Sequence, residues 1–480
     1  MKRLLATKPV QAIDELEDSH QLQRALGAPA LIALGIGVII GTGIFVLTGV
    51  ASAQHAGPAL MLSFMLAGLG CAFAGLCYAE FAAMIPVSGS AYSYSYATLG
   101  EFIAWFIGWN LILEYTVAPA TVSVGWSGYV ISLLSQLGID LPATLTHAPF
   151  RAGDGHHLEL TGAIINLPAV LIVAMMTVLC YVGIRQSAGF NNVVVIMKTL
   201  VVILFIAVGA FYVNPDNWVP FIPPNTGTFG HFGWSGVAQA SGIIFFSYIG
   251  FDCVSTAALE AKNPQRDMPI GILVSLLLCT FLYVAVSAVL TGMVPYTELD
   301  VPAPVALALD TYPSLNWLSG WLKLGAIGGM TSVILVLMLG QARIFYAMSR
   351  DGLLPPMFGA VHPKFHTPYK STLVTGVGAA VVAGLFPIDI LGEIVSIGTL
   401  LAFVTVCIGV LVLRYTRPDL HRPFRVPRPW FVCIAGAVVC GGMMLSLPHD
   451  TWLRLVVWTA LGIVIYFLYG YRHSVLRKNT

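Results

Sequence analysis

Two long apolar runs of this chain are interrupted in their middle by residues that weaken a helix. The run 28–53 holds four glycines at alternate or nearly alternate positions: Gly35, Gly37, Gly41 and Gly43. The run 236–260 holds glycine, hydroxyl residues and an acid between Ser241 and Asp252. Glycine weakens a helix because it has no side chain and great conformational freedom. Close packing between helices would explain the glycines of the first run equally well if that run stood alone.

An interrupted helix leaves backbone groups unpaired, and such groups can bind a small charged ligand. Freed N–H groups can hold a carboxylate, whereas freed carbonyl groups can hold an ammonium. An amino acid presents both groups on one carbon atom. We expect the bare backbone at Gly41, Thr42 and Gly43 to hold the carboxylate. The carbonyls expected to hold the amine are those of Ile40, Phe246, Ser247 and Ile249.

Aromatic side chains flank the second interruption. An aromatic residue in an apolar run usually serves packing alone. Beside an interruption, a role in gating or in a side-chain pocket is equally plausible, so Phe246 and Tyr248 are candidate substrate-binding residues. Asp252 follows the interruption and is expected to cap the helix that resumes there, since an acid is favoured at a helix N-terminus.

Two ionisable residues lie deep in other apolar runs. Such a group costs roughly 2.5–3.5 kcal/mol at bilayer depth, which makes it a functional candidate. Lys198 either extends to the membrane surface or reaches the first interruption with its ammonium group. Because a buried lysine loses its proton more readily than an exposed one, the second alternative makes Lys198 a candidate for proton coupling. Glu114 is either a structural hydrogen-bond partner or a group near the substrate.

The composition requires a membrane around most of the chain. Of the 480 residues, 57% are hydrophobic and 9% are charged, whereas a soluble domain carries about 25% charged residues. A spanning helix needs about 20 mostly apolar residues. Twelve runs meet this condition: 28–53, 58–84, 101–134, 162–182, 193–213, 236–260, 269–293, 317–343, 371–386, 391–413, 430–447 and 452–471. We therefore expect an all-α polytopic membrane protein with 12 transmembrane helices.

The positions of lysine and arginine predict the orientation of these spans. Nineteen of the 23 lysines and arginines fall on one side of this map, which the positive-inside rule assigns to the cytoplasm. Both tails, 1–27 and 472–480, are then cytoplasmic. The polar start and the length of the first apolar run indicate that no signal peptide is cleaved. We expect a multi-pass protein of the plasma (inner) membrane.

The two interrupted runs occupy corresponding places in the order of spans. Each begins a set of five, 28–213 and 236–413, and a last pair of helices covers 430–471. An odd number of spans in each set gives the two sets opposite orientations. Paired interruptions in two inverted repeats mark the substrate site of many secondary transporters. This pattern favours a carrier with alternating access around its first and sixth helices.

Four motifs extend across most of the chain: 33–49, 78–92, 250–264 and 341–355. With these motifs the chain resembles the amino acid–polyamine–organocation superfamily, and specifically its cationic amino acid transporter branch. The stretch 341–355 is highly specific for that branch. One departure falls at 258–260, where the branch often carries two consecutive acids and this chain has only Glu260.

The resemblance implies two inverted five-helix repeats, in which the third and eighth helices form a scaffold beside the broken helices, plus two peripheral helices. Met330 of the eighth span would then line the substrate pocket or face another helix. Lys198 would lie where sodium-coupled relatives hold a sodium ion, and members with a lysine there are similar to proton-coupled carriers. The proton gradient would supply the driving force, and no cofactor is implied.

The class of amino acid remains open at this point. The branch is named for cationic amino acids, but its bacterial members include carriers of small neutral ones. A buried cation needs a carboxylate partner, and Glu114 would supply it. Met330 would instead occupy volume that a long guanidinium side chain needs. Exchange of amino acids is an alternative to proton symport.

Other classes of function fit the sequence less well. No HExxH, Walker A or paired-aspartate motif supports a membrane-embedded enzyme, and two broken helices in one chain suit a carrier better than a channel. The eight cysteines lie almost wholly in apolar runs without a CxxC or Cys/His cluster, so no metal site is expected. The net charge of +1 argues against a nucleic-acid partner. The expected partners are an amino acid and the lipid bilayer, and the oligomeric state is undetermined.

Overall fold

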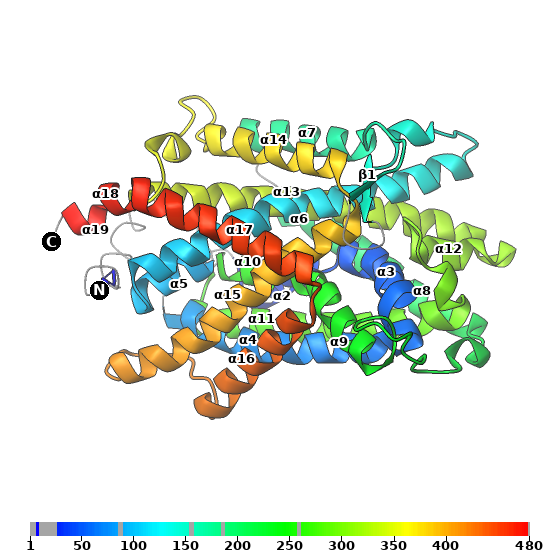
Figure 1. The fold of residues 1–480 in the computed structure, drawn as a ribbon, viewed down its shortest axis with the longest axis horizontal. Helices are drawn as coiled ribbons and strands as arrows, with labels where there is room; N and C mark the ends of the chain where they lie inside the picture. The colour runs from blue at the N-terminus through cyan, green and yellow to red at the C-terminus, as the bar shows by residue number, and fades with distance from the viewer. Residues whose placement is uncertain are drawn as a thin grey trace.

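The computed structural model describes residues 6–8, 26–84, 90–152, 158–183, 188–256 and 261–478. Helices dominate it, and many of them run along the long axis of the molecule (Figure 1). The two terminal segments lie at the same end (Figure 1). Both contact Asp351 there, because Lys8 forms a 2.8 Å ion pair with its carboxylate and Val475 donates a 3.0 Å backbone hydrogen bond to its carbonyl.

The helices of the first half are α2 (Ala28–Ile39), α3 (Thr48–Ala51), α4 (Leu60–Met84), α5 (Ser90–Thr98), α6 (Glu101–Gln136), α7 (Leu167–Val182) and α8 (Ala188–Gly209). The π-helical segment η1 (Gly43–Leu47) precedes α3, and the short turns η2 (Ser52–Ala56) and η3 (Gly57–Ala59) lead on to α4. Between α6 and α7, strands β1 (Phe150–Ala152) and β2 (Leu158–Leu160) pair in antiparallel register.

The helices of the second half are α9 (Gly233–Ile244), α10 (Phe251–Thr256), α11 (Pro264–Met293), α12 (Pro304–Asp310), α13 (Asn316–Arg350), α14 (Tyr369–Leu385), α15 (Ile388–Thr416), α16 (Pro429–Ser446), α17 (His449–Ile465), α18 (Tyr471–His473) and α19 (Val475–Lys478). The 3-10 segment η7 (Phe245–Tyr248) extends α9 toward α10.

Within the described residues, eight helical segments are long and apolar enough to cross a membrane. They are Gly43–Met84, Glu101–Gln136, Val193–Tyr212, Pro264–Met293, Pro313–Arg350, Ile388–Thr416, Pro429–Ser446 and His449–His473. The shorter helices α2, α7 and α14 are also apolar. Each of the twelve predicted runs contains helix. The chain is therefore a helical multi-pass membrane protein.

Two pairs of long helices form the framework of the molecule. α6 packs along α13, and α4 packs along α11. α2 lies against α11, and α15 contacts both α6 and α16. These contacts enclose the interrupted segments, so the residues of η1 and η7 are buried throughout.

Candidate functional site

The first interruption falls where the glycines predict it. α2 ends at Ile39, and the chain becomes extended at Ile40, whose ψ is 100°. Helical backbone resumes at Thr42 and continues into η1. We call Ile40 and Gly41 the first break. The carbonyl groups at the end of α2 and the N–H groups at the start of η1 face this break without their usual intrahelical partners.

The second interruption lies between η7 and α10. Ile249 is extended, with a ψ of 137°, and Gly250 has a φ of +107°. That φ lies in the region that only glycine adopts readily. A Cβ atom on Gly250 would also overlap the side chain of Val38 in α2. Glycine is thus required here both for the backbone conformation and for the approach of the two broken helices. We call Ile249 and Gly250 the second break.

The two breaks lie against each other. A Cβ atom on Gly43 would overlap the Cα atom of Ser247, so no side chain separates the two segments there. The hydroxyl oxygen of Tyr283 in α11 lies 2.7 Å from the carbonyl oxygen of Ile39 and 2.8 Å from that of Ser247. One tyrosine therefore reaches the freed carbonyls of both broken helices.

A small cavity of about 10 Å³, which is room for about one water molecule, lies between the breaks. It is lined by residues of both broken helices and by apolar side chains of α6 and α13: Val38, Ile39, Gly41, Thr42, Gly43, Val122, Phe246, Ile249, Val333 and Leu337. The described residues that line it include no acid. The lining suits a small molecule that has charged groups at one end and an apolar group at the other, and the cavity must widen to admit one.

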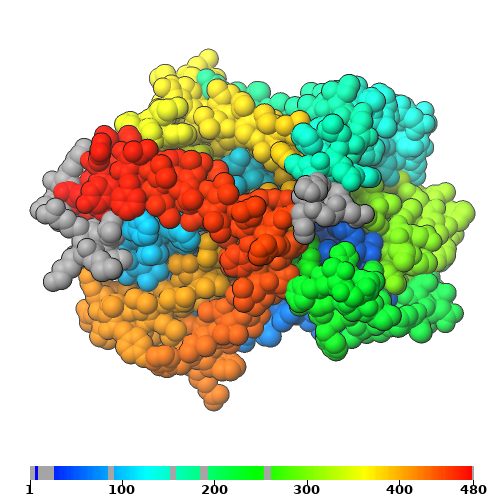
Figure 2. Space-filling model, in the orientation of Figure 1, coloured from blue at the N-terminus to red at the C-terminus, as the bar shows by residue number. Residues whose placement is uncertain are grey.

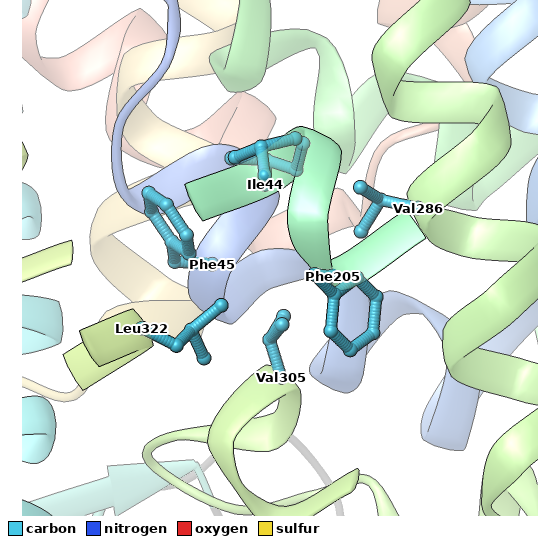
Figure 3. Close-up of a pocket in the computed structure, with 7 residues that line it drawn as sticks. Ile44, Phe45, Phe205, Val286, Val305 and Leu322 are labelled. Atoms are coloured by element: carbon cyan, nitrogen blue, oxygen red, sulfur yellow. The ribbon is translucent and has the colours of Figure 1, made fainter. Parts of the chain in front are cut away.

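A second cavity, too small to hold a water molecule, lies beyond the first break and has no polar side chain in its lining. Figure 3 shows the side chains of Ile44, Phe45, Phe205, Val286, Val305 and Leu322 around this space. They come from η1, α8, α11, α12 and α13. Because a charged group would find no partner there, this cavity is not a site for an amino acid.

Lys198 reaches the first break from α8. Its ammonium group donates hydrogen bonds to the carbonyls of Gly37 and Ile40, the second at 2.9 Å. The side chain is fully buried and does not extend to the membrane surface. Gly329 of α13 makes room for it, because a Cβ atom there would lie 2.9 Å from Cδ of the lysine. A charged side chain thus caps the end of α2.

Glu114 lies away from the cavity, nearer the N-terminus of α6. It is buried, and the hydroxyl of Thr399 in α15 is a polar neighbour of its carboxylate. Its nearest acidic neighbour is Asp252, whose carboxylate accepts a 2.7 Å hydrogen bond from the hydroxyl of Tyr115. Val122, which lines the cavity, lies eight residues further along α6, about 12 Å at 1.5 Å per residue. Asp252 occupies the first turn of α10, as expected for a capping acid.

Met330 contacts the first break directly. Its sulfur accepts a 3.2 Å hydrogen bond from the hydroxyl of Thr42, and the side chain is fully buried. Of the two alternatives for Met330, the structure thus favours the side of the candidate site. Val333 and Leu337 follow it on α13 at helical spacing and line the cavity. That spacing was a signal in the sequence that could have identified both residues.

The aromatic residues of η7 point to different places. Phe246 lines the cavity, and its N–H donates a 3.1 Å hydrogen bond to the hydroxyl of Ser396 in α15. Tyr248 instead donates a 3.1 Å hydrogen bond to the carbonyl of Phe64 in α4 and is absent from the lining. The hydroxyl of Ser247, between them, is buried and has no partner among the described residues.

The structure therefore brings together Ile40, Gly41, Thr42, Gly43, Phe246, Ser247, Ile249, Met330 and Lys198 around the breaks. It places Glu114 and Tyr248 away from the cavity. Sequence reasoning missed Tyr283, Ser396 and Val122, which are ordinary residues of apolar runs. Among the described residues, no group of three or more histidine, cysteine or acidic side chains is placed to hold a metal ion.

Comparison with known proteins agrees with this architecture. The profile of the amino acid permease family matches residues 26–471. The chain is 48% identical to the methylthioribose transporter of Bacillus subtilis (strain 168) over the full length of both. It is 50% identical to the branched-chain amino acid permease BcaP of the same organism over 95% of each chain. It is 38% identical to the vacuolar cationic amino acid transporter 4 of Arabidopsis thaliana, over 87% of this chain and 68% of that protein. The chain is thus a transporter and not an enzyme, and it belongs to the amino acid permease family of the amino acid–polyamine–organocation superfamily.

Proposed function

We propose that this chain is a secondary active transporter of L-amino acids with small apolar side chains. The observation that carries this proposal is the lining of the cavity between the breaks. Residues of both broken helices line it, among them Gly41 and Gly43, which have no side chain, and Val122, Val333 and Leu337 complete the lining with apolar side chains. A cationic side chain in such a pocket would lack the carboxylate that its burial requires. The neutral alternative of the two sequence-based hypotheses is therefore favoured.

We further propose the membrane arrangement in which 28–213 and 236–413 form two inverted repeats and 430–471 adds two peripheral helices. Both tails are cytoplasmic in this arrangement. The interrupted helices at the start of each repeat support it, as does the position of both terminal segments at one end of the molecule. Alternating access would proceed by movement of the broken helices against α6 and α13.

Lys198 is the proposed coupling group for protons. When charged, it holds the carbonyls of Gly37 and Ile40 by charge-assisted hydrogen bonds. Loss of its proton weakens this cap, so the conformation of the first break depends on protonation. A proton that crosses the membrane with the substrate contributes about 2.3 kcal/mol per 100 mV. Exchange without net proton movement remains the competing hypothesis.

Competition of labelled alanine uptake in proteoliposomes tests the substrate class. All twenty amino acids and methylthioribose serve as competitors. We expect alanine and other small apolar amino acids to compete, and arginine and lysine to have little effect. Competition by cationic amino acids alone would overturn the apolar assignment, and competition by methylthioribose alone would overturn the amino acid class. Abolition of concentrative uptake by a protonophore would support coupling, whereas uptake that depends only on internal amino acid would support exchange.

A further inference from the structure

The connection between α15 and α16 carries an unusual concentration of positive charge. Five arginines lie between the last turn of α15 and the start of α16: Arg414, Arg417, Arg422, Arg425 and Arg428. The connection lies at the same end of the molecule as the termini (Figure 1), and the orange part of the surface that includes it is at the lower left of Figure 2. This end is the proposed cytoplasmic side.

Two of the arginines point inward and share one carboxylate. Glu80 of α4 is buried and accepts a 3.2 Å hydrogen bond from Nε of Arg414. Nε of Arg422 lies 3.5 Å from the same oxygen, Oε1 of Glu80, and Nη2 of Arg414 lies 2.5 Å from Oε2. The backbone N–H of Val426 donates a 2.7 Å hydrogen bond to the same carboxylate. Glu80 therefore anchors the connection to α4.

Arg422 also fixes the shape of the connection from within. Its guanidinium group donates to the carbonyls of Arg417 at 2.7 Å and Leu420 at 2.8 Å. The pKa of the Arg422 guanidinium lies below its usual value, mainly because the group is buried. The Glu80 carboxylate opposes this shift, and the nearby charges of Arg414 and Arg425 add to it. Four prolines between positions 418 and 429 restrict the backbone further. The connection is thus held in one shape before any ligand binds.

The remaining three arginines point outward. Arg417, Arg425 and Arg428 are exposed, and none of them forms an ion pair within the described part of the chain. Asp419 is the one acid in the sequence 414–428, and Glu80 pairs with the two inward arginines, so positive charge remains in excess. Arg428 directly precedes α16, whose first N–H groups add positive potential at the same place.

Exposed aromatic side chains lie beside these arginines. Tyr415 and Trp430 are 63% and 56% exposed, and their rings make an edge contact with centroids 5.3 Å apart. Phe431 is 65% exposed in the first turn of α16. Tyrosine and tryptophan favour the headgroup level of a bilayer, and arginine binds phosphate in a bidentate manner. Charge and aromatic rings together match an anionic phospholipid better than a soluble anion.

We propose that Arg417, Arg425 and Arg428, with Tyr415 and Trp430, bind the headgroup of an anionic phospholipid of the cytoplasmic leaflet. Because the same connection holds Glu80, a bound lipid would also stabilise the end of α4 against α15. The proposed transport function does not involve this site, so the proposal goes beyond it.

The test uses the full-length protein in detergent, with dioleoyl phosphatidylglycerol and dioleoyl phosphatidylcholine as probes, and native mass spectrometry as the measurement of binding. We expect clear preference for phosphatidylglycerol. One arginine near an anionic surface contributes roughly fivefold in affinity. The triple variant Arg417→Gln/Arg425→Gln/Arg428→Gln should therefore bind phosphatidylglycerol on the order of 100-fold more weakly.

A matched control removes the same charge elsewhere. Arg266, Arg350 and Arg472 are also exposed, and their replacement by glutamine should leave the lipid preference unchanged. Equal loss in both triple variants, or equal binding of the two lipids to the wild type, would overturn the proposal. A site for a soluble anion would show two results: millimolar inorganic phosphate would displace the lipid, and Trp430→Ala would bind phosphatidylglycerol as well as the wild type does. That outcome would also overturn the proposal. If the triple variant does not fold, Arg428→Gln alone should show about a fivefold loss.

Discussion

The ammonium nitrogen of Lys198 lies 2.9 Å from the carbonyl oxygen of Ile40, the residue that directly follows the end of α2. This hydrogen bond joins α8 to the first break. A charged amine donates stronger hydrogen bonds than a neutral one, so the stability of the break depends on one proton. The same break supplies backbone to the cavity. Protonation of Lys198 and occupancy of the cavity are therefore expected to influence each other.

Replacement of Lys198 tests this coupling. Lys198→Ala should remove the pH dependence of uptake and prevent accumulation driven by a proton gradient, while substrate binding persists. Lys198→Arg should also fail to accumulate substrate, because arginine keeps its proton. Uptake driven by a pH jump and binding by calorimetry would measure the two effects separately. Proton-driven accumulation that survives in Lys198→Ala would rule out this lysine as the coupling group.

Two glycines of the first broken helix should respond differently to substitution. A Cβ atom on Gly41 would lie 3.4 Å from Val333, at the cavity. Gly41→Ala should therefore lower substrate affinity several-fold while the protein stays folded. A side chain on Gly43 would overlap Ser247 backbone, so Gly43→Val should abolish binding and also lower the unfolding temperature. Unchanged affinity in Gly41→Ala would contradict the placement of the substrate at the breaks.

The selectivity of the pocket can be tested at Met330. Met330→Ser removes volume beside Thr42, so a small neutral pocket should admit larger amino acids such as leucine. If arginine already fits the wild type tightly, the same change should weaken arginine binding instead. Met338→Ser is a matched control, because Met338 is buried in the same helix eight residues further on, whereas Met330 accepts the hydrogen bond from Thr42. The measurement is competition of labelled alanine binding. No effect on any substrate would remove Met330 from the site.

Tyr283 is expected to hold the two broken helices together. Tyr283→Phe removes the hydroxyl near the carbonyls of Ile39 and Ser247 and leaves a buried acceptor unsatisfied, which costs about 1–3 kcal/mol. We expect a lower unfolding temperature in detergent and slower uptake. Tyr212→Phe is the control, since that hydroxyl contacts Ser314 near the surface. Wild-type stability and transport in Tyr283→Phe would show that this bridge is dispensable.

The proposed orientation predicts which loops a membrane-impermeant thiol reagent can reach. The seven native cysteines whose surroundings are described are buried. The reagent should therefore react mainly with a cysteine that is introduced at an exposed position. Thr228→Cys should react in intact cells, because the 214–233 loop is extracellular in this arrangement. Lys364→Cys should react only after permeabilisation. Reaction of Lys364→Cys from outside would invert the map.

Local properties of the sequence were sufficient for the helical, multi-pass character of the chain and for the stretches that hold both breaks. The hydropathy of a run depends on its own residues, and each of the twelve runs contains helix. Glycine acts on its own backbone, so the predicted interrupted stretches, 35–43 and 241–252, contain the breaks that the structure shows. The motifs likewise identified the family, which the comparisons confirm. The antiparallel pair β1 and β2 was not predicted. Each strand has three residues, which is too short to show the alternation of polar and apolar residues that marks a strand.

Only the tertiary structure decided which side chains meet at the breaks. The direction of a side chain depends on the rotation of its helix and on the helix packed against it, and neither can be read from one apolar run. Glu114 therefore lies beside Asp252 and not at the cavity, and Tyr248 bonds to α4. Tyr283 joins both breaks for the same reason, since α11 is packed between α2 and α4. The packing of α4 against α15 likewise decides which arginines of the α15–α16 connection turn inward to Glu80, because that buried carboxylate needs cationic partners.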